Sequence, residues 1–169
     1  ELLVVIVLVG IITSLAVVTM GGRDDRIEQE ARRLATVVNT ASREAIIEAR
    51  ELGLVLEHDG YRFMRLDEGD WHGEAYAQDR ALRPHTLPDN VRLGVTTDGM
   101  PGEREPGEDD GDNNNGGGDN QPHVLILSSG ELTPFEATLR RDSGGGDAWQ
   151  VTATIDGGVD YAPLDDEAP

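Results

Sequence analysis

Hydrophobic and polar positions divide this chain into three regions with different periodicities. The first is an unbroken apolar run over residues 2–20, preceded by a single carboxylate at Glu1. As a helix, the run would be about 28 Å long, close to the ~30 Å thickness of the hydrocarbon layer of a bilayer. The run therefore predicts a helix that spans a membrane.

Two common kinds of apolar segment fit this run poorly. A secretory signal peptide begins with basic residues, has a shorter apolar core and ends at a small-residue cleavage site. A plain single-span anchor usually carries Arg or Lys at its cytoplasmic end, whereas this run follows Glu1. The sequence also lacks an initiator Met, so we expect it to continue upstream. An ordinary anchor and a filament subunit both stay open at this point.

The second region, residues 23–52, has the period of an amphipathic helix. Two glycines separate it from the apolar run, after which apolar residues recur at steps of three or four, the spacing of one helix face. These residues are Ile27, Ala31, Leu34, Val38, Ala41, Ala45, Ala49 and Leu52. Gly53 closes the pattern as the expected C-cap. We expect one long helix, with residues 1–22 apolar all round and residues 23–52 laying an alanine-rich stripe on a sheet.

The third region, residues 53–163, alternates as strands do. Residues 54–66 predict a hairpin with a turn at residues 58–60. Further strands are expected at 91–96, 124–127, 135–139 and 150–155, with Gly130 and Glu131 as a two-residue turn between the second and third of these. A helix followed by strands predicts an α+β fold, in which the long N-terminal helix packs along an antiparallel sheet. Residues 164–169 are expected to form a short tail.

A low-complexity acidic stretch at about residues 98–121 interrupts the strands. It has no apolar periodicity and cannot bury enough surface to offset the entropy of ordering it, so we expect a disordered loop. Asp110, Asp112 and Asn114 sit at alternate positions, as in a calcium-binding EF-hand loop. That loop needs Gly at its sixth position and Glu at its twelfth, where this chain has Asn115 and a glutamine. The EF-hand match fails, and a looser calcium site stays open.

Charge and the catalogue of known motifs exclude several classes of function. The net charge of −19 disfavours nucleic-acid binding, which needs basic patches to neutralise phosphate. The chain has no cysteine, and its histidines show no metal-site spacing: His58, His72, His85 and His123. Residues 128–130 (SSG) lack the preceding Gly of a nucleophile elbow, and no phosphate-binding loop is present. We therefore expect a protein that is not an enzyme and holds no cofactor and, apart from the calcium site left open above, no metal.

The residues that carry most information resemble a known family. Residues 1–6 (ELLVVI) resemble the core of the type IV pilin N-terminus, in which a glutamate is the fifth residue after the prepilin cleavage site. Residues 31–54, 59–71 and 125–139 resemble GspH-type minor pseudopilins of the type II secretion system, and residues 127–135 (LSSGELTPF) narrow the resemblance to the GspH group. The resemblance covers nearly the whole chain except the acidic loop.

The resemblance implies a structural subunit of a secretion filament. Such proteins are made as prepilins, cleaved by the prepilin peptidase, N-methylated, and held in inner-membrane lipid as single-pass proteins with the globular domain in the periplasm. They are then assembled with other major and minor pseudopilins, on the inner-membrane platform of the type II system, into a short pseudopilus that helps to export folded proteins across the outer membrane.

In this scheme Glu1 would pair with the N-terminal amine of a neighbouring subunit, because a cationic partner recovers much of the cost of burying a carboxylate. The apolar half of the helix would lie first in the membrane and then in the filament core. Its members are Leu2, Leu3, Val4, Val5, Ile6, Val7, Leu8, Val9, Ile11, Ile12 and Leu15.

Two alternatives stay open. A FimT-like minor pilin of a type IV pilus, serving adhesion, motility or DNA uptake, shares the fold, although the only basic pairs, Arg32-Arg33 and Arg140-Arg141, are few for DNA binding. A membrane-tethered periplasmic enzyme or binding module would need a deep pocket lined by titratable groups with perturbed pKa values.

Overall fold

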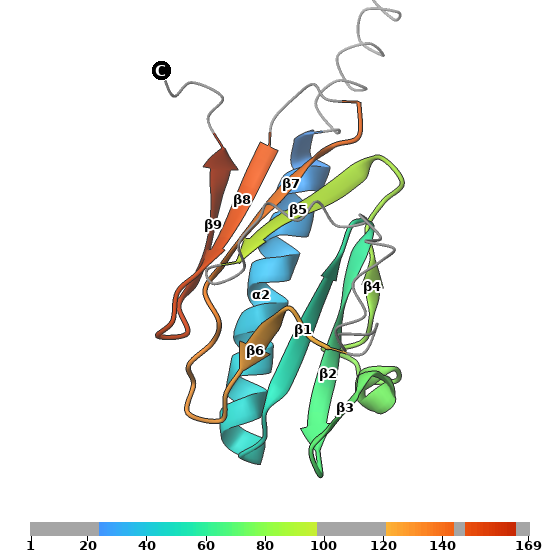
Figure 1. Cartoon of the computed structure of the whole chain (residues 1–169). Coiled ribbons are helices and arrows are strands. Elements are labelled where there is room, and N and C mark those ends of the chain that lie inside the picture. The colour runs from blue at the N-terminus through green and yellow to red at the C-terminus, as the bar shows by residue number, and fades with distance from the viewer. Residues whose placement is uncertain (1–23, 98–120, 144–147, 165–169) are drawn as a thin grey trace, which may run out of the picture.

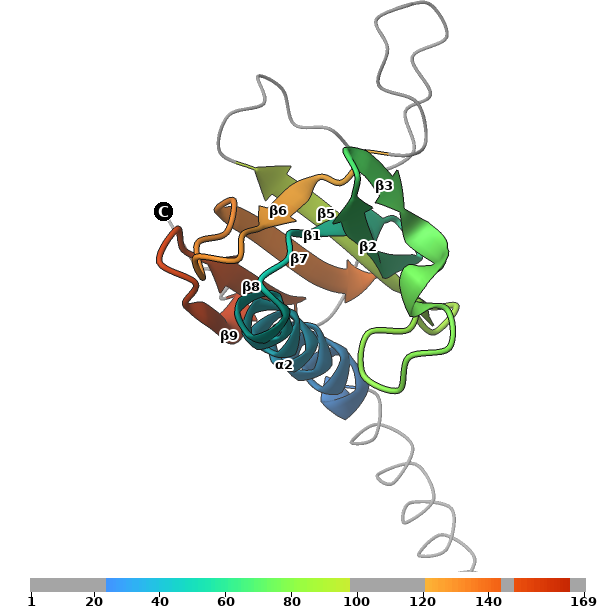
Figure 2. The same ribbon diagram turned by 90° about the horizontal axis from the view of Figure 1, so that it is seen from below.

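The computed structural model describes residues 24–97, 121–143 and 148–164, which form one long helix and two antiparallel sheets (Figure 1). The helix, α2 (Asp24–Glu48), lies along one side of both sheets (Figure 2). The predicted α+β class, a long helix on antiparallel strands, is confirmed. The strands form two sheets, however, where the sequence pattern predicted one.

The first sheet has the strand order β3-β2-β1-β6, with β4 paired to the start of β2. Its strands are β1 (Leu52–Glu57), β2 (Gly60–Asp67), β3 (Asp70–His72), β4 (His85–Thr86) and β6 (Val124–Ile126), and a short 3₁₀ turn, η1 (Gly73–Tyr76), follows β3. The second sheet has the order β5-β7-β8-β9. Its strands are β5 (Val91–Thr97), β7 (Phe135–Arg141), β8 (Ala148–Ala153) and β9 (Val159–Leu164).

The buried face of α2 follows the predicted apolar stripe. Six of its side chains are at most 1% exposed: Ile27, Ala31, Leu34, Val38, Ala41 and Ala45. Because half of these are alanine, the helix axis can approach the strands beneath it closely, and the larger side chains of the core come from the sheets. Those that are fully buried include Phe63, Leu54, Leu56, Leu93, Phe135 and Leu139.

The helix ends four residues earlier than the sequence pattern predicted. Ala49 takes a left-handed conformation (φ 50°), its N–H donates to the Ile46 carbonyl, and the Arg50 N–H donates to the Ala45 carbonyl. These two bonds form a Schellman cap, with alanine at the position that glycine usually occupies. The predicted cap at Gly53 is therefore wrong.

Gly53 instead lies inside β1, where space is the constraint. A Cβ at this position would lie 2.5 Å from the Pro122 Cβ and 3.0 Å from a ring carbon of Trp71. The glycine lets the segment before β6 and the ring of Trp71 lie directly on β1.

The predicted β1–β2 hairpin is confirmed, with Leu52 in register with Arg65 and Glu57 with Gly60. The predicted strands at 91–96, 124–127, 135–139 and 150–155 are present as β5 to β8, with ends shifted by up to two residues. The chain does turn at residues 127–130, where the Gly130 N–H donates to the Leu127 carbonyl. The predicted Gly130-Glu131 turn does not join paired strands, however, because β6 pairs with β1 while β7 pairs with β5 and β8. The chain crosses from one sheet to the other between them. Strands β3, β4 and β9 were not predicted, and β9 carries Leu164, which was expected to begin the tail.

Candidate functional site

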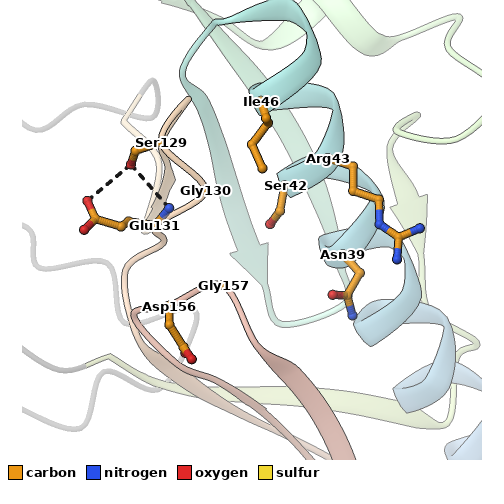
Figure 3. Close-up of a pocket in the computed structure, with 9 residues that line it drawn as sticks. All are labelled: Asn39, Ser42, Arg43, Ile46, Ser129, Gly130, Glu131, Asp156 and Gly157. Atoms are coloured by element: carbon orange, nitrogen blue, oxygen red, sulfur yellow. Dashed lines mark hydrogen bonds between the residues drawn. The ribbon is translucent and has the colours of Figure 1, made fainter.

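A surface groove lies where the last turns of α2 meet the two loops beside them (Figure 3). It has a volume of about 360 Å³ and is open to solvent. Asn39, Ser42, Arg43 and Ile46 come from α2, Ser129, Gly130 and Glu131 come from the crossover after β6, and Asp156 and Gly157 come from the β8–β9 turn. Three segments that are distant in the sequence therefore build one surface.

Two glycines allow these segments to approach one another. Gly130 and Gly157 both have positive φ angles, 94° and 86°. A Cβ on Gly157 would lie 2.5 Å from the Gly130 carbonyl oxygen, and a Cβ on Gly130 would lie 3.2 Å from Ile46 Cδ1. The crossover and the β8–β9 turn are thus in backbone contact, and the crossover rests on the helix.

The polar groups of the groove are held by local hydrogen bonds. Ser129 Oγ donates to a Glu131 carboxylate oxygen at 3.2 Å and accepts from the Glu131 N–H at 3.4 Å (Figure 3). A hydrogen bond from the Thr154 hydroxyl lowers the pKa of the exposed Asp156 carboxyl. These bonds shape the loops, and they do not form a nucleophile–base pair of the kind acyl transfer needs.

Large apolar side chains are exposed in the segments that form this groove. Ile46 is 51% exposed and Ile47 79%, in the last turns of α2, and Ile155 in the β8–β9 turn is 65% exposed. Isoleucines exposed together at one end of a strongly acidic molecule are typical of a protein contact surface. We call the groove with Ile46, Ile47 and Ile155 the helix-end surface.

Among the described residues, no three His, Cys, Asp or Glu side chains gather to hold a metal ion. His58 and His72 are exposed, while His123 Nδ1 accepts the N–H of Leu56 at 3.1 Å. Two of these histidines therefore lie on the surface, and the third accepts a hydrogen bond from the backbone of β1.

His85 binds the other end of α2. Its Nε2 lies 2.7 Å from a Glu30 carboxylate oxygen, and the two side chains are only 14% and 16% exposed. The ring of Tyr61 lies beside His85, with ring centroids 5.2 Å apart. Burial raises the pKa of Tyr61 to about 12, and it outweighs the opposing attraction of Arg33. This cluster joins β2 and β4 to the helix.

The residues that the sequence singled out for assembly and membrane insertion, Glu1 and the apolar set from Leu2 to Leu15, lie outside the described residues. So do the candidate calcium ligands Asp110, Asp112 and Asn114. In the part of the chain that the structure describes, no helix is long and apolar enough to cross a membrane.

The fold is the one seen in solved minor pseudopilins. A crystal structure of the minor pseudopilin EPSH from the type II secretion system of Vibrio cholerae matches with a TM-score of 0.64 at 22% identity, over 85% of this chain and 99% of that one. The solution structure of E. coli GspH matches with a TM-score of 0.57 at 20% identity, over 88% and 99%. At these identities the likeness shows the fold alone.

Sequence comparison identifies the family. The family model "Type II transport protein GspH" matches residues 30–158, and this chain belongs to the GspH family. A protein of Pseudomonas aeruginosa named "Type II secretion system protein H" is 36% identical over 148 residues, which cover 82% of this chain and 78% of the relative. A protein of the same name from Aeromonas hydrophila is 32% identical over 144 residues, covering 82% and 76%.

Sequence reasoning assigned the SSG segment to a turn but did not connect it to α2. One signal in the sequence could have indicated this surface. Ile46 and Ile47 are adjacent and lie off the predicted apolar stripe of the helix, so they could not both be buried together with the stripe. Two apolar side chains on the solvent face of a helix indicate a contact outside the domain.

Proposed function

We propose that this chain is a structural minor pseudopilin that helps the type II secretion pseudopilus to drive folded proteins across the outer membrane. Its membership of the GspH family, over residues 30–158, carries the proposal. The two curated relatives are named for type II secretion, which favours this function over that of a FimT-like pilin. A subunit of this family is structural, and the groove's solvent-open loops suit that role better than catalysis.

In this proposal, residues 2–20 anchor the subunit in the inner membrane and hold the β-domain in the periplasm. Three residues separate Met20 from Asp24, where α2 begins, so the anchor and the domain are closely coupled. When the subunit moves from the membrane into the filament, the apolar helix exchanges lipid for the helices of other pseudopilins.

Glu1 guides that exchange. A carboxylate next to an apolar helix is costly to bury alone, and the amine of a neighbouring subunit's first residue offsets much of that cost. The pair sets the register of one helix against the next, because an apolar run alone fits a neighbour in several positions.

The helix-end surface is the part of the β-domain that contacts a neighbouring subunit. It lies at the end of α2 away from the anchor, where subunits stacked through their N-terminal helices would meet the next domain. Its exposed isoleucines supply apolar contact area, and Arg43, Glu131 and Asp156 supply both signs of charge around it.

Export measurements in the native host test the proposal. A strain that lacks this gene would be complemented with the wild type or with Glu1→Gln, which keeps the size of the side chain and removes its charge. Membrane fractions would be checked for the subunit. We expect the deletion to lose export and Glu1→Gln to fail to restore it while the subunit accumulates in the membrane.

The outcomes separate the two parts of the proposal. Normal export in the deletion strain would contradict a role in secretion. Normal export with Glu1→Gln alone would leave that role in place and contradict the pairing of Glu1.

A further inference from the structure

The two tryptophans of the chain lie at opposite ends of the described domain. Trp71 in β3 is in register with Leu66, whose N–H donates to the Glu51 carbonyl at 3.0 Å, three residues past the end of α2. Trp149 is at the start of β8, and Figure 1 shows that the start of β8, the end of β9 and the start of α2 lie at the same end of the domain.

Hydrogen bonding fixes how far Trp149 lies from the start of the helix. Asn39 Nδ2 donates to the Val159 carbonyl at 3.4 Å, which places the beginning of β9 beside the middle of α2. From Val159 to Pro163, β9 covers about 13 Å in the direction of the start of α2. From Asn39 back to Asp24, α2 covers about 22 Å. Because Trp149 is in register with Pro163, its level along the helix axis lies within about two helical turns of the start of α2.

Trp149 belongs to a partly exposed aromatic cluster on this edge, at the margin of the hydrophobic core. Its ring lies 5.8 Å from that of Tyr161, with the planes inclined by 33°. Trp149, Tyr161 and Pro163 share one face of β8 and β9, on which Val151 and Ala153 continue into the core. Tyr161 is 37% exposed, whereas Trp149 is partly buried, with one part of its side chain packed against the core and the rest open to solvent. We call Trp149, Tyr161 and Pro163 the aromatic edge.

The chemistry of this edge matches the interface of a bilayer. Tryptophan and tyrosine gather at the level of lipid headgroups, because each combines an apolar ring with a polar N–H or O–H. Addition of a further β-strand fits less well, because Pro163 offers no N–H and proline is a common way to block an edge strand.

Chain length brings the aromatic edge to the membrane. From Met20 to Asp24 the backbone spans at most about 14 Å, so insertion of residues 2–20 holds the start of α2 within that distance of the hydrocarbon layer. The headgroup region of each leaflet is about 5–8 Å thick. A domain that leans toward β9 therefore lays its aromatic edge among the headgroups without any extension of the chain.

We propose that, before assembly, the β-domain rests on the bilayer surface through the aromatic edge. This inference rests on the proposed function, because it requires residues 2–20 to be inserted. The contact is made by rings and their polar groups rather than by cations, since the chain carries a net charge of −19 and Asp160 lies beside Tyr161. The same contact holds the helix-end surface away from the membrane and open to incoming subunits.

The two tryptophans supply the test and its control. The full-length protein would be reconstituted in phosphatidylcholine vesicles whose acyl chains carry bromine close to the headgroup, a short-range quencher of tryptophan. Trp71→Phe leaves Trp149 as the reporter, and Trp149→Phe leaves Trp71. We expect the fluorescence of Trp149 to be largely lost in brominated vesicles relative to unbrominated ones, and that of Trp71 to be unchanged. Quenching by acrylamide, a neutral reagent that the acidic chain does not repel, should fall for Trp149 when vesicles are present.

Vesicle flotation distinguishes failure of this inference from failure of the proposed function. Protein that floats with the vesicles but shows equal bromine quenching of the two tryptophans would overturn the contact and leave the membrane anchor in place. Protein that does not float would contradict both.

Discussion

The two ends of α2 are held in opposite ways. Near its start, Glu30 is paired with His85 and packed beside the buried Tyr61, so that little of this cluster meets solvent. Near its end, backbone contacts at Gly130 and Gly157 hold the neighbouring loops, and Ile46 and Ile47 face outward. One end is closed by side chains, whereas the other is built from backbone and leaves its apolar side chains exposed. We conclude that the first end keeps the domain together, whereas the second has the exposed apolar area that the proposed subunit contact requires.

The largest effect is expected from breaking the backbone contact at the helix end. Gly157→Ala places a Cβ 2.5 Å from the Gly130 carbonyl oxygen at a positive φ. Strain and overpacking together should lower the free energy of unfolding by about 4 kcal/mol. Gly69→Ala is the matched control, because Gly69 has a φ of 97° but no atom within 4 Å of its Cβ position, and we expect only about 1 kcal/mol there. Urea unfolding of the detergent-solubilised variants measures both, and equal losses would contradict the close contact.

Alkaline pH should lower the free energy of unfolding through the cluster near the start of α2, where Tyr61 is buried. The pKa of Tyr61 is about 12 in the folded chain against 10.0 for the free side chain. Folding therefore disfavours the phenolate form of Tyr61. The stability that the neutral side chain contributes is complete below pH 10 and is lost as the pH rises toward 12. The total loss is about 3 kcal/mol.

Tyr61→Phe should remove this part of the pH dependence, as seen by comparing unfolding free energies at pH 8 and pH 11. Tyr161→Phe, on the exposed aromatic edge, should leave it in place. The same alkaline loss in Tyr61→Phe as in the wild type would show that the closed end does not depend on the buried phenol.

The sequence predicted the buried stripe of α2 and most strands, because apolar periodicity is a local signal. Prediction from the sequence failed where the local structure depends on residues that are distant in the chain. Gly53 was taken as a helix cap, and only the approach of Pro122 and Trp71 explains its place inside β1. The split into two sheets depends on β6 pairing with β1, seventy residues earlier in the chain. The helix-end surface was missed for the same reason, since its three segments meet only in the folded chain.

A smaller effect, of opposite sign, is expected at the helix cap. Ala49 holds a φ of 50°, which glycine adopts without strain. Ala49→Gly should therefore raise the free energy of unfolding by about 1 kcal/mol. Ala45→Gly, four residues earlier on the buried face, should lower it by at least about 1 kcal/mol. If Ala49→Gly were destabilising too, the helix would continue past Glu48.

The smallest change in stability is expected at the exposed isoleucines. Ile47 is 79% exposed, so Ile47→Gln should alter the free energy of unfolding by no more than about 0.5 kcal/mol. Export should nevertheless fall, because the helix-end surface loses apolar contact area. Asp59→Asn, in the exposed turn between β1 and β2, is the control for export. Full export by Ile47→Gln would place the subunit contact elsewhere.

Cysteine cross-linking in cells tests most directly whether the helix-end surface contacts other pseudopilins. The chain contains no cysteine, so a single cysteine reports on one position alone. Ile47→Cys would be compared with Asp59→Cys, in the exposed turn between β1 and β2. We expect Ile47→Cys, treated with a short thiol-to-amine cross-linker, to form adducts with other pseudopilins when the secretion system is assembled, and Asp59→Cys to form few. Adducts through Asp59→Cys and none through Ile47→Cys would contradict the assignment of this surface.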